Sequence, residues 1–184
     1  MKKSVIIPIL FLFANVLFCQ NSIYDSLDVK LSKMSDNLDS FKEVEDYFQK
    51  CLVIQKAGNF EKSLNYYHKL KEIAERKNNK QVLMMCYLRI AMVLHKTSKY
   101  KDALEMNNKA IMIYENSKDD KGIQLLYADV SINIGTIFDD IADYQKAIEY
   151  YHKSIIASKS INDTTRILKA TMNIGACFYN LRVC

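Results

Sequence analysis

The chain contains few of the residues that interrupt helices. Its 184 residues include four Gly, one Pro and no Trp. Gly and Pro are the residues that most often punctuate turns and strand ends, so a fold built from many short strands is not expected. Hydrophobic residues make up 49% of the chain and charged residues 26%, which is typical of a folded globular protein. We therefore expect an all-α fold.

The sequence also lacks the short motifs that carry common enzyme chemistry. It contains no HExxH, GxxxxGK, GxSxG or GxGxxG pattern, and four glycines are too few for a phosphate-binding loop. We accordingly expect no enzyme activity, with no catalytic residue, no metal ligand and no cofactor.

No apolar run in the chain is long enough to cross a bilayer, but a shorter apolar run lies near its start. Lys2 and Lys3 precede a mostly apolar stretch at 5–18, about 14 residues against the roughly 20 that a membrane-spanning helix needs. A polar stretch begins at Gln20. This layout is that of a secretory signal peptide, predicted at 1–19, so we expect an exported, periplasmic or otherwise extracytoplasmic protein. Lipid attachment at Cys19 is the less favoured alternative, because a large residue, Phe18, precedes it.

The chain carries no excess charge of one sign that would indicate nucleic acid as a partner. The formal net charge is +5, and removal of Lys2 and Lys3 leaves 24 basic against 21 acidic residues, or +3. The lysines are not clustered in one stretch. We expect protein rather than nucleic acid as the partner, and no membrane span in the mature chain.

The cysteines form no CxxC pair. Four remain after the signal peptide: Cys51, Cys86, Cys177 and Cys184. Cys177 and Cys184 are seven positions apart, about 10.5 Å of helical rise, too far for a disulfide while the helix is intact. We interpret Cys51 as a small core residue; the oxidation state of all four stays open in an exported chain.

What the chain does contain is an internal repeat. The segments GNFEKSLNYYHK (58–69), SKYKDALEMNNK (98–109) and ADYQKAIEYYHK (142–153) superpose without gaps. The sixth residue of each segment is small (Ser63, Ala103 and Ala147), and another small residue lies twelve positions before it. The segment MNIGACF at 172–178 begins a fourth copy. These earlier small residues are Cys51, Ala91, Gly135 and, in the fourth copy, Gly175, and the steps between them are 40, 44 and 40 residues. A period of this length with helical apolar spacing predicts stacked helix pairs.

Small residues are expected where the two helices of a pair cross. Ala91 is predicted to face Ala103, and Gly135 to face Ala147, because closely packed helices admit only small side chains at the crossing. Asn59, Ser98 and Asp143 are candidate N-caps for the second helix of each pair.

Two of the three histidines belong to the repeated YYHK. Tyr67 and Tyr151 are expected to pack inward, and His68 and His152 to follow on the exposed side. Two repeats of stacking would place these histidines about 16–20 Å apart or more. Both could not bind one zinc ion, so the repeated YYHK is interpreted as an echo of the repeat rather than a site.

The pattern resembles the tetratricopeptide repeat (TPR). A small residue in the first helix, then an aromatic and an alanine opening the second, recur in DYQKAIEYYHKSI at 143–155 and KYKDALEMNNKAI at 99–111. The resemblance implies a right-handed α-solenoid of antiparallel helix pairs, a long-helix variant of about 3.5 repeats. The expected division is a lead-in at 20–39 and a repeat domain at 40–184, with repeats at 40–79, 80–121 and 122–163 and a partial one at 164–184.

The resemblance also implies where a ligand would bind. The first helices of TPR pairs line a hollow that receives extended peptides, and eight positions match those that face it. They are Gln49, Gln55, Arg89, His95, Asn133, Asp139, Asn173 and Tyr179. Arg89, His95 and Lys96 are expected to make one section basic, and Asp129, Asp139 and Asp140 to make the next acidic.

The last repeat suggests a further contact. Phe178, Leu181 and Val183 have no second helix to cover them, so we expect a C-terminal continuation or a partner over this edge. Exported TPR regions of this kind resemble the N-terminal sensory or interaction parts of bacterial signalling proteins. The alternatives are a cytosolic peptide-receptor regulator and, less favoured, a metal-site or enzymatic helical protein. The ligand and the oligomeric state stay open.

Overall fold

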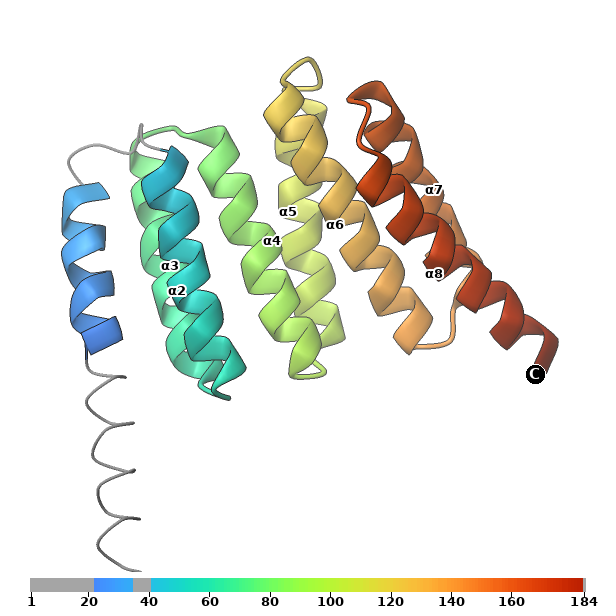
Figure 1. Ribbon diagram of the computed structural model, residues 1–184, viewed down its shortest axis with the longest axis horizontal. Helices are drawn as coiled ribbons and strands as arrows, with labels where there is room; N and C mark the ends of the chain where they lie inside the picture. Colours follow the sequence, from blue (N-terminus) through green and yellow to red (C-terminus); the bar gives the residue numbers. More distant parts are fainter. Residues whose placement is uncertain (1–21, 35–40, 184) are drawn as a thin grey trace, which may run out of the picture. The chain divides into compact units, whose positions relative to one another are not determined.

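The computed structural model describes residues 22–34 and 41–183, and every regular element in these ranges is an α-helix (Figure 1). The prediction of an all-α fold of stacked helix pairs is therefore confirmed. The chain divides into two compact units, 1–73 and 74–184. None of the described helices combines the length and apolarity that crossing a membrane requires. The predicted signal peptide lies outside the described residues.

The first unit contains a helix that the sequence predicted only as a lead-in. Residues 22–34 are helical and pack against α2 (Phe41–Lys56) and the part of α3 (Phe60–Arg76) that belongs to this unit. Leu27 is fully buried, and the ring of Tyr24 stacks on Tyr66 with centroids 6.3 Å apart. The Tyr47 hydroxyl donates to the carbonyl of Tyr66 at 2.8 Å. Cys51 is a buried core residue here, as predicted.

Among its described residues, the second unit contains five complete helices packed in chain order. They are α4 (Lys80–Lys96), α5 (Tyr100–Glu115), α6 (Lys121–Asp140), α7 (Tyr144–Ser160) and α8 (Thr164–Val183). Each helix contacts the next, and α6 also contacts α4 and α8. In Figure 1, α6 and α8 lie in front of α5 and α7, so the first helices of successive pairs form one layer.

The turns within the pairs share one backbone conformation. Gly58, Ser98 and Ala142 all have positive φ angles, of 84°, 58° and 60°. These positions are equivalent in the repeat, and the left-handed residue is what ends the first helix of each pair. Ser98 therefore occupies the turn, and its predicted role as an N-cap is wrong: the cap of α5 is Lys99, which makes no side-chain bond to the helix. Asp143 is an N-cap as predicted, and accepts from the Lys146 N–H.

The helix crossings depend on small residues, as predicted. Ala91, Ala103 and Ala147 have no exposed surface, and Gly135 is buried. A Cβ added at Gly135 would lie 2.6 Å from Cε1 of Tyr151, whereas one added at Gly175 would have no neighbour within 4 Å. At their crossing, α6 and α7 therefore approach so closely that a side chain at position 135 would collide with Tyr151.

Candidate functional site

The first helices of three successive pairs enclose a cavity in the second unit. Its volume is about 520 Å³, and we call it the α4–α6–α8 cavity. The lining combines apolar side chains with several polar ones. The residues are Met85, Leu88, Arg89, Met92 and His95 from α4, Leu126, Asp129, Ile132, Asn133 and Thr136 from α6, and Lys169 and Asn173 from α8. Helical spacing explains this grouping, because residues four apart on one helix share a face.

Four of the predicted binding residues meet in this cavity. Arg89, His95, Asn133 and Asn173 come from the first helices of three repeats, yet they line a single space. Asn133 is nearly buried, and its Nδ2 donates to Oδ1 of Asn107 on α5 at 3.2 Å. This bond fixes the Asn133 side chain, since one of its two N–H groups is committed to the fold. Asn107 stands at the repeat position that Tyr67 and Tyr151 occupy in the other pairs.

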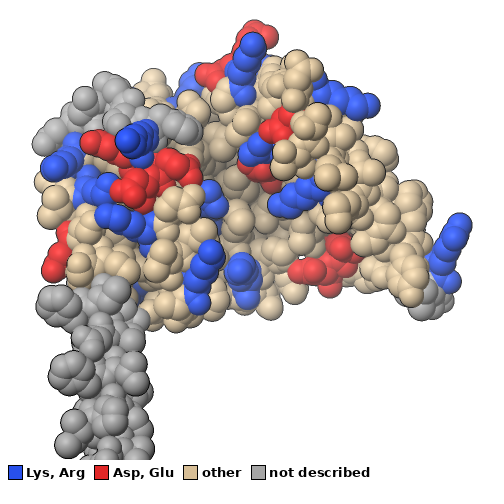
Figure 2. All heavy atoms as spheres, in the orientation of Figure 1, with Lys and Arg blue, Asp and Glu red and all other residues tan. Residues whose placement is uncertain are grey.

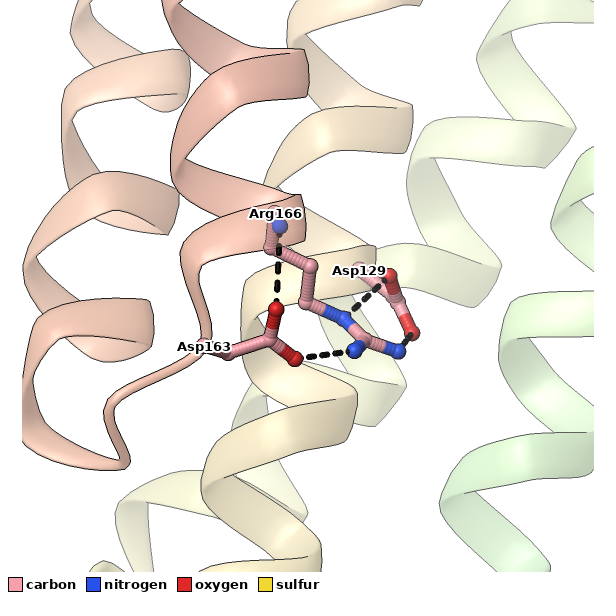
Figure 3. Close-up of polar contacts among 3 residues, drawn as sticks. All are labelled: Asp129, Asp163 and Arg166. Atoms are coloured by element: carbon pink, nitrogen blue, oxygen red, sulfur yellow. Dashed lines mark hydrogen bonds and ion pairs between the residues drawn. The ribbon is translucent and has the colours of Figure 1, made fainter.

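One wall of the cavity is held by a three-residue ion-pair network (Figure 3). Arg166 of α8 donates from Nε and Nη2 to the two carboxylate oxygens of Asp129 on α6, at 2.8 and 2.7 Å. Its Nη1 donates to Asp163, the residue before α8, which also accepts from the Arg166 backbone N–H. That N–H and the guanidinium lower the pKa of Asp163, and the Asp129 carboxylate raises the pKa of Arg166. The network joins α6 to α8.

Two of the three carboxylates predicted to make an acidic section contact residues of other helices. Asp129 has both oxygens bound by Arg166, and Asp140 Oδ2 lies 2.6 Å from Nε2 of His95. Each of these two carboxylates therefore contacts a side chain of another helix, Arg166 or His95, and neither Asp139 nor Asp140 lines the cavity. Lys169, which is exposed, adds a positive charge to the lining. Elsewhere on the face seen in Figure 2, basic and acidic side chains are interspersed over the described surface.

The other four predicted residues do not line this cavity. Gln49 and Gln55 belong to the first unit, where Gln49 is exposed and donates to Glu45 at 2.7 Å, and Gln55 is buried. Asp139 accepts from Sγ of Cys177 at 3.5 Å. Tyr179 is 70% exposed on α8.

The structure adds cavity residues that the sequence reasoning missed. Met85 lies one helical turn before Arg89, and Lys169 lies one turn before Asn173. Extending each predicted position by four residues toward the N-terminus would have found both. Met side chains are flexible and polarizable, so Met85 and Met92 give the cavity an adaptable apolar wall.

In both copies of the repeated YYHK, the second tyrosine is buried and the histidine is exposed. His68 and His152 are both exposed, while Tyr67 and Tyr151 are buried, as expected for a packing repeat. Burial is the main factor that raises the pKa of Tyr151 to about 12. Across the described ranges, 22–34 and 41–183, no group of three or more His, Cys, Asp or Glu could hold a metal ion.

The described cysteines, Cys51, Cys86 and Cys177, are buried thiols. Burial, together with the nearby Asp139 carboxylate, raises the pKa of Cys177 to about 11.

Comparison with known proteins identifies the repeat. A family model described as the tetratricopeptide repeat matches residues 42–116, which span α2 to α5. Among solved structures, the crystal structure of BtubC (BKLC) from P. vanneervenii is similar, with a TM-score of 0.72 and 19% sequence identity. The match covers 87% of this chain but 64% of that protein, so this chain spans less than two thirds of its length. At this identity the likeness concerns the fold. The search of curated proteins gave no match.

Proposed function

Because the chain is a tetratricopeptide repeat protein, we propose that it binds an extended segment of another protein in the α4–α6–α8 cavity. The repeat is in general a scaffold for protein–protein interaction. The observation that carries this proposal is the convergence of Arg89, Asn133 and Asn173, from three helices, on one cavity with apolar walls. A volume of about 520 Å³ lies in the range of ligand sites and would take a few side chains of a peptide.

The polar groups suggest how the ligand is held. The Asn173 amide and the uncommitted groups of the Asn133 amide can bond peptide carbonyl and N–H groups of any sequence. Because Asn133 is fixed by Asn107, little side-chain entropy is lost when it binds.

The positive charge of the lining suggests which sequences are preferred. The exposed Lys169 favours a ligand that carries a carboxylate, and the bonds from Arg166 to Asp129 reduce the repulsion that this carboxylate would exert on such a ligand. Met85 and Met92 favour an apolar residue next to that carboxylate. The proposed ligand is therefore an extended peptide with an acidic residue beside an apolar one.

The test is selection of peptides from a random eight-residue library on the purified full chain. We expect enrichment of Asp or Glu next to an apolar residue. The binding of one selected peptide is then measured with Asn173→Ala and Lys169→Glu, which should each weaken it at least tenfold. Lys159→Glu is the matched control, because Lys159 is exposed and does not line the cavity. Peptides that bind all three variants as they bind the wild type would refute the site.

We further propose that the chain is exported and acts as the interaction part of an extracytoplasmic signalling system. The support is the signal-like pattern at 1–19 and the resemblance noted above. N-terminal sequencing of the protein recovered from cells tests it: a chain that begins at Gln20 agrees, whereas one that begins at Met1 in the cytosol favours the cytosolic regulator.

A further inference from the structure

A second pocket lies between α4 and α5, and we call it the α4–α5 pocket. Its volume is about 440 Å³, within the range of about 300–1,000 Å³ that is typical of small-molecule sites. Leu83 of its lining precedes Met85 of the α4–α6–α8 cavity by two residues, or about 200° round the helix, so the two spaces open on nearly opposite faces of α4. The lining is mostly apolar and consists of Lys80, Leu83 and Tyr87 of α4, Lys109, Met112 and Ile113 of α5, and Asn116, which follows α5.

The equivalent place in the next pair contains two stacked aromatic rings. Forty-four residues on, Tyr127 of α6 stands at the repeat position of Leu83. Its ring stacks on that of Tyr114 of α5, with centroids 3.7 Å apart and an angle of 8° between the planes. The residue equivalent to Tyr114 in the preceding repeat is Ala74, forty residues earlier. Smaller side chains thus replace both rings beside the α4–α5 pair, and their loss explains the space that is found there.

The walls of the α4–α5 pocket suit an aromatic group. Tyr87 stands where α6 has Ser131, and its hydroxyl donates to Oε1 of Glu75 at 3.4 Å. Because the hydroxyl is committed to Glu75, the ring is the part of Tyr87 that remains for a ligand. Met112 lines the pocket from α5 and is 66% exposed, and a thioether makes favourable contacts with the edge of an aromatic ring.

The charged groups determine where an anionic group would lie. Lys109 is paired with Glu105 of its own helix, Nζ to Oε1 at 2.9 Å, so its charge is largely compensated. Lys80 is exposed and its Nζ donates to the Ser117 hydroxyl at 3.3 Å, a bond that leaves the positive charge in place. The Glu75 carboxylate at the Tyr87 hydroxyl would repel an anion at that end. A ligand is therefore favoured when its anionic group lies at Lys80, seven residues or about 10.5 Å of helical rise from Tyr87.

We propose that the α4–α5 pocket binds a small aromatic carboxylic acid, with its ring against Leu83 and Tyr87 and its carboxylate at Lys80. The ring takes the place that the chain itself fills with tyrosine one repeat later. This site is separate from the α4–α6–α8 cavity and does not depend on the function proposed for it. The chain would thus bind a small molecule as well as a segment of another protein.

The probe is 3-phenylpropionate, titrated into the purified full chain and followed by calorimetry. We expect saturable binding. Two relatives of the probe separate the contributions of its parts. The first, 3-cyclohexylpropionate, has no aromatic ring and should bind at least threefold more weakly, because it loses the ring contacts. The second, 3-phenylpropanol, has no carboxylate and should also bind more weakly.

Variants of the chain locate the site. Leu83→Tyr introduces the residue that α6 carries at the equivalent position, so it should fold normally, occupy the pocket and lower the affinity for 3-phenylpropionate at least tenfold. Ile156→Tyr is the matched control, since it adds the same side chain at a 70% exposed position of α7 outside the pocket. Lys80→Glu should weaken binding of the acid at least fivefold and leave binding of 3-phenylpropanol unchanged.

Four outcomes would overturn the proposal. The first is the absence of saturable binding of 3-phenylpropionate to the wild type. The second is equal affinity in the wild type and in a Leu83→Tyr chain shown by circular dichroism to be folded. The third is binding of the cyclohexyl compound as tight as that of the aromatic acid. The fourth is tighter binding of the uncharged N-acetyltyrosine amide than of the acid, unaffected by Lys80→Glu, which would assign the pocket to an aromatic side chain of a partner protein.

Discussion

The ring of Tyr151 on α7 lies against the backbone of Gly135 on α6, and Cε1 is 2.6 Å from the position that a Cβ would take. The equivalent glycine of the next repeat, Gly175, has no such neighbour. Two residues that the sequence makes equivalent therefore stand in opposite environments, and the same substitution should affect them in opposite directions.

Gly135→Ala should destabilise the protein, and Gly175→Ala should stabilise it. At Gly135 the methyl group meets an aromatic ring that is itself buried, so overpacking should lower the free energy of unfolding by about 1–3 kcal/mol. At Gly175 the helix gains the better propensity of Ala, up to about 1 kcal/mol. Urea denaturation measures both. Changes of the same sign would contradict the difference in packing.

Ala142→Gly should stabilise the turn between α6 and α7. Ala142 has a φ of 60°, a conformation that costs an L-residue about 1–2 kcal/mol and glycine almost nothing. Glycine also gains freedom in the unfolded chain, so we expect a net increase of up to about 1 kcal/mol in unfolding free energy. Ala147→Gly, at a helical position that is fully buried, is the control and should reduce stability.

Arg166→Ala should loosen α8 from α6. The change leaves the part-buried Asp129 carboxylate without its two charge-assisted bonds, and we expect a loss of about 1–3 kcal/mol in unfolding free energy. Arg166→Lys should recover only part of it, because an ammonium group cannot make the paired bonds of a guanidinium. Arg182→Ala, at an exposed position of the same helix, serves as the control. Full recovery by lysine would show that charge alone matters.

The contribution of Asp163 should depend on pH. Its pKa in the folded protein is lowered, chiefly by the Arg166 N–H, below the value of about 3.9 expected when unfolded. The carboxylate therefore stabilises the fold above about pH 4, and this part is lost as the pH falls through the folded pKa. Asp163→Asn keeps a capping side chain but not the charge, so the stability difference from wild type should be largest near pH 7 and shrink toward pH 3. A difference that grows on acidification would refute this.

Leu27→Ala should destabilise the first unit. Leu27 is fully buried although it lies in a segment outside the predicted repeats, and truncation of such a leucine costs about 2–5 kcal/mol. Hydrogen exchange of α2 and of α3 up to Ile73 should accelerate. Val29→Ala removes an exposed side chain of the same helix and should change exchange little. Unchanged exchange in both variants would mean that residues 22–34 do not stabilise the unit.

The features that could be predicted from the sequence are those that recur. Ala91, Gly135 and Ala147 are found at crossings because a repeated small residue has one physical explanation at every copy. The helix at 22–34 has no counterpart in the repeat, so periodicity could not indicate it. The misassignment of Ser98 has a similar cause: serine is both a good cap and a tolerable turn residue, and only the backbone angle distinguishes them.

The candidate site was predictable in part. Arg89, His95, Asn133 and Asn173 follow from the repeat register, which fixes the face of each helix. The bond between Asp129 and Arg166, 37 residues apart, depends on how far α8 is shifted along α6, and no local pattern encodes that shift. The charge of the cavity depends on this bond, and the sequence therefore could not indicate how much of the Asp129 charge a ligand would meet.

The main contacts among α4–α8 join helices that are neighbours or next neighbours in the chain. Each segment of about forty residues thus finds its main partners close by, so folding can start at any pair and spread outward without closing long loops. Damage at one end should remain local, and a copy could be gained or lost in evolution while the surrounding pairs keep their shape.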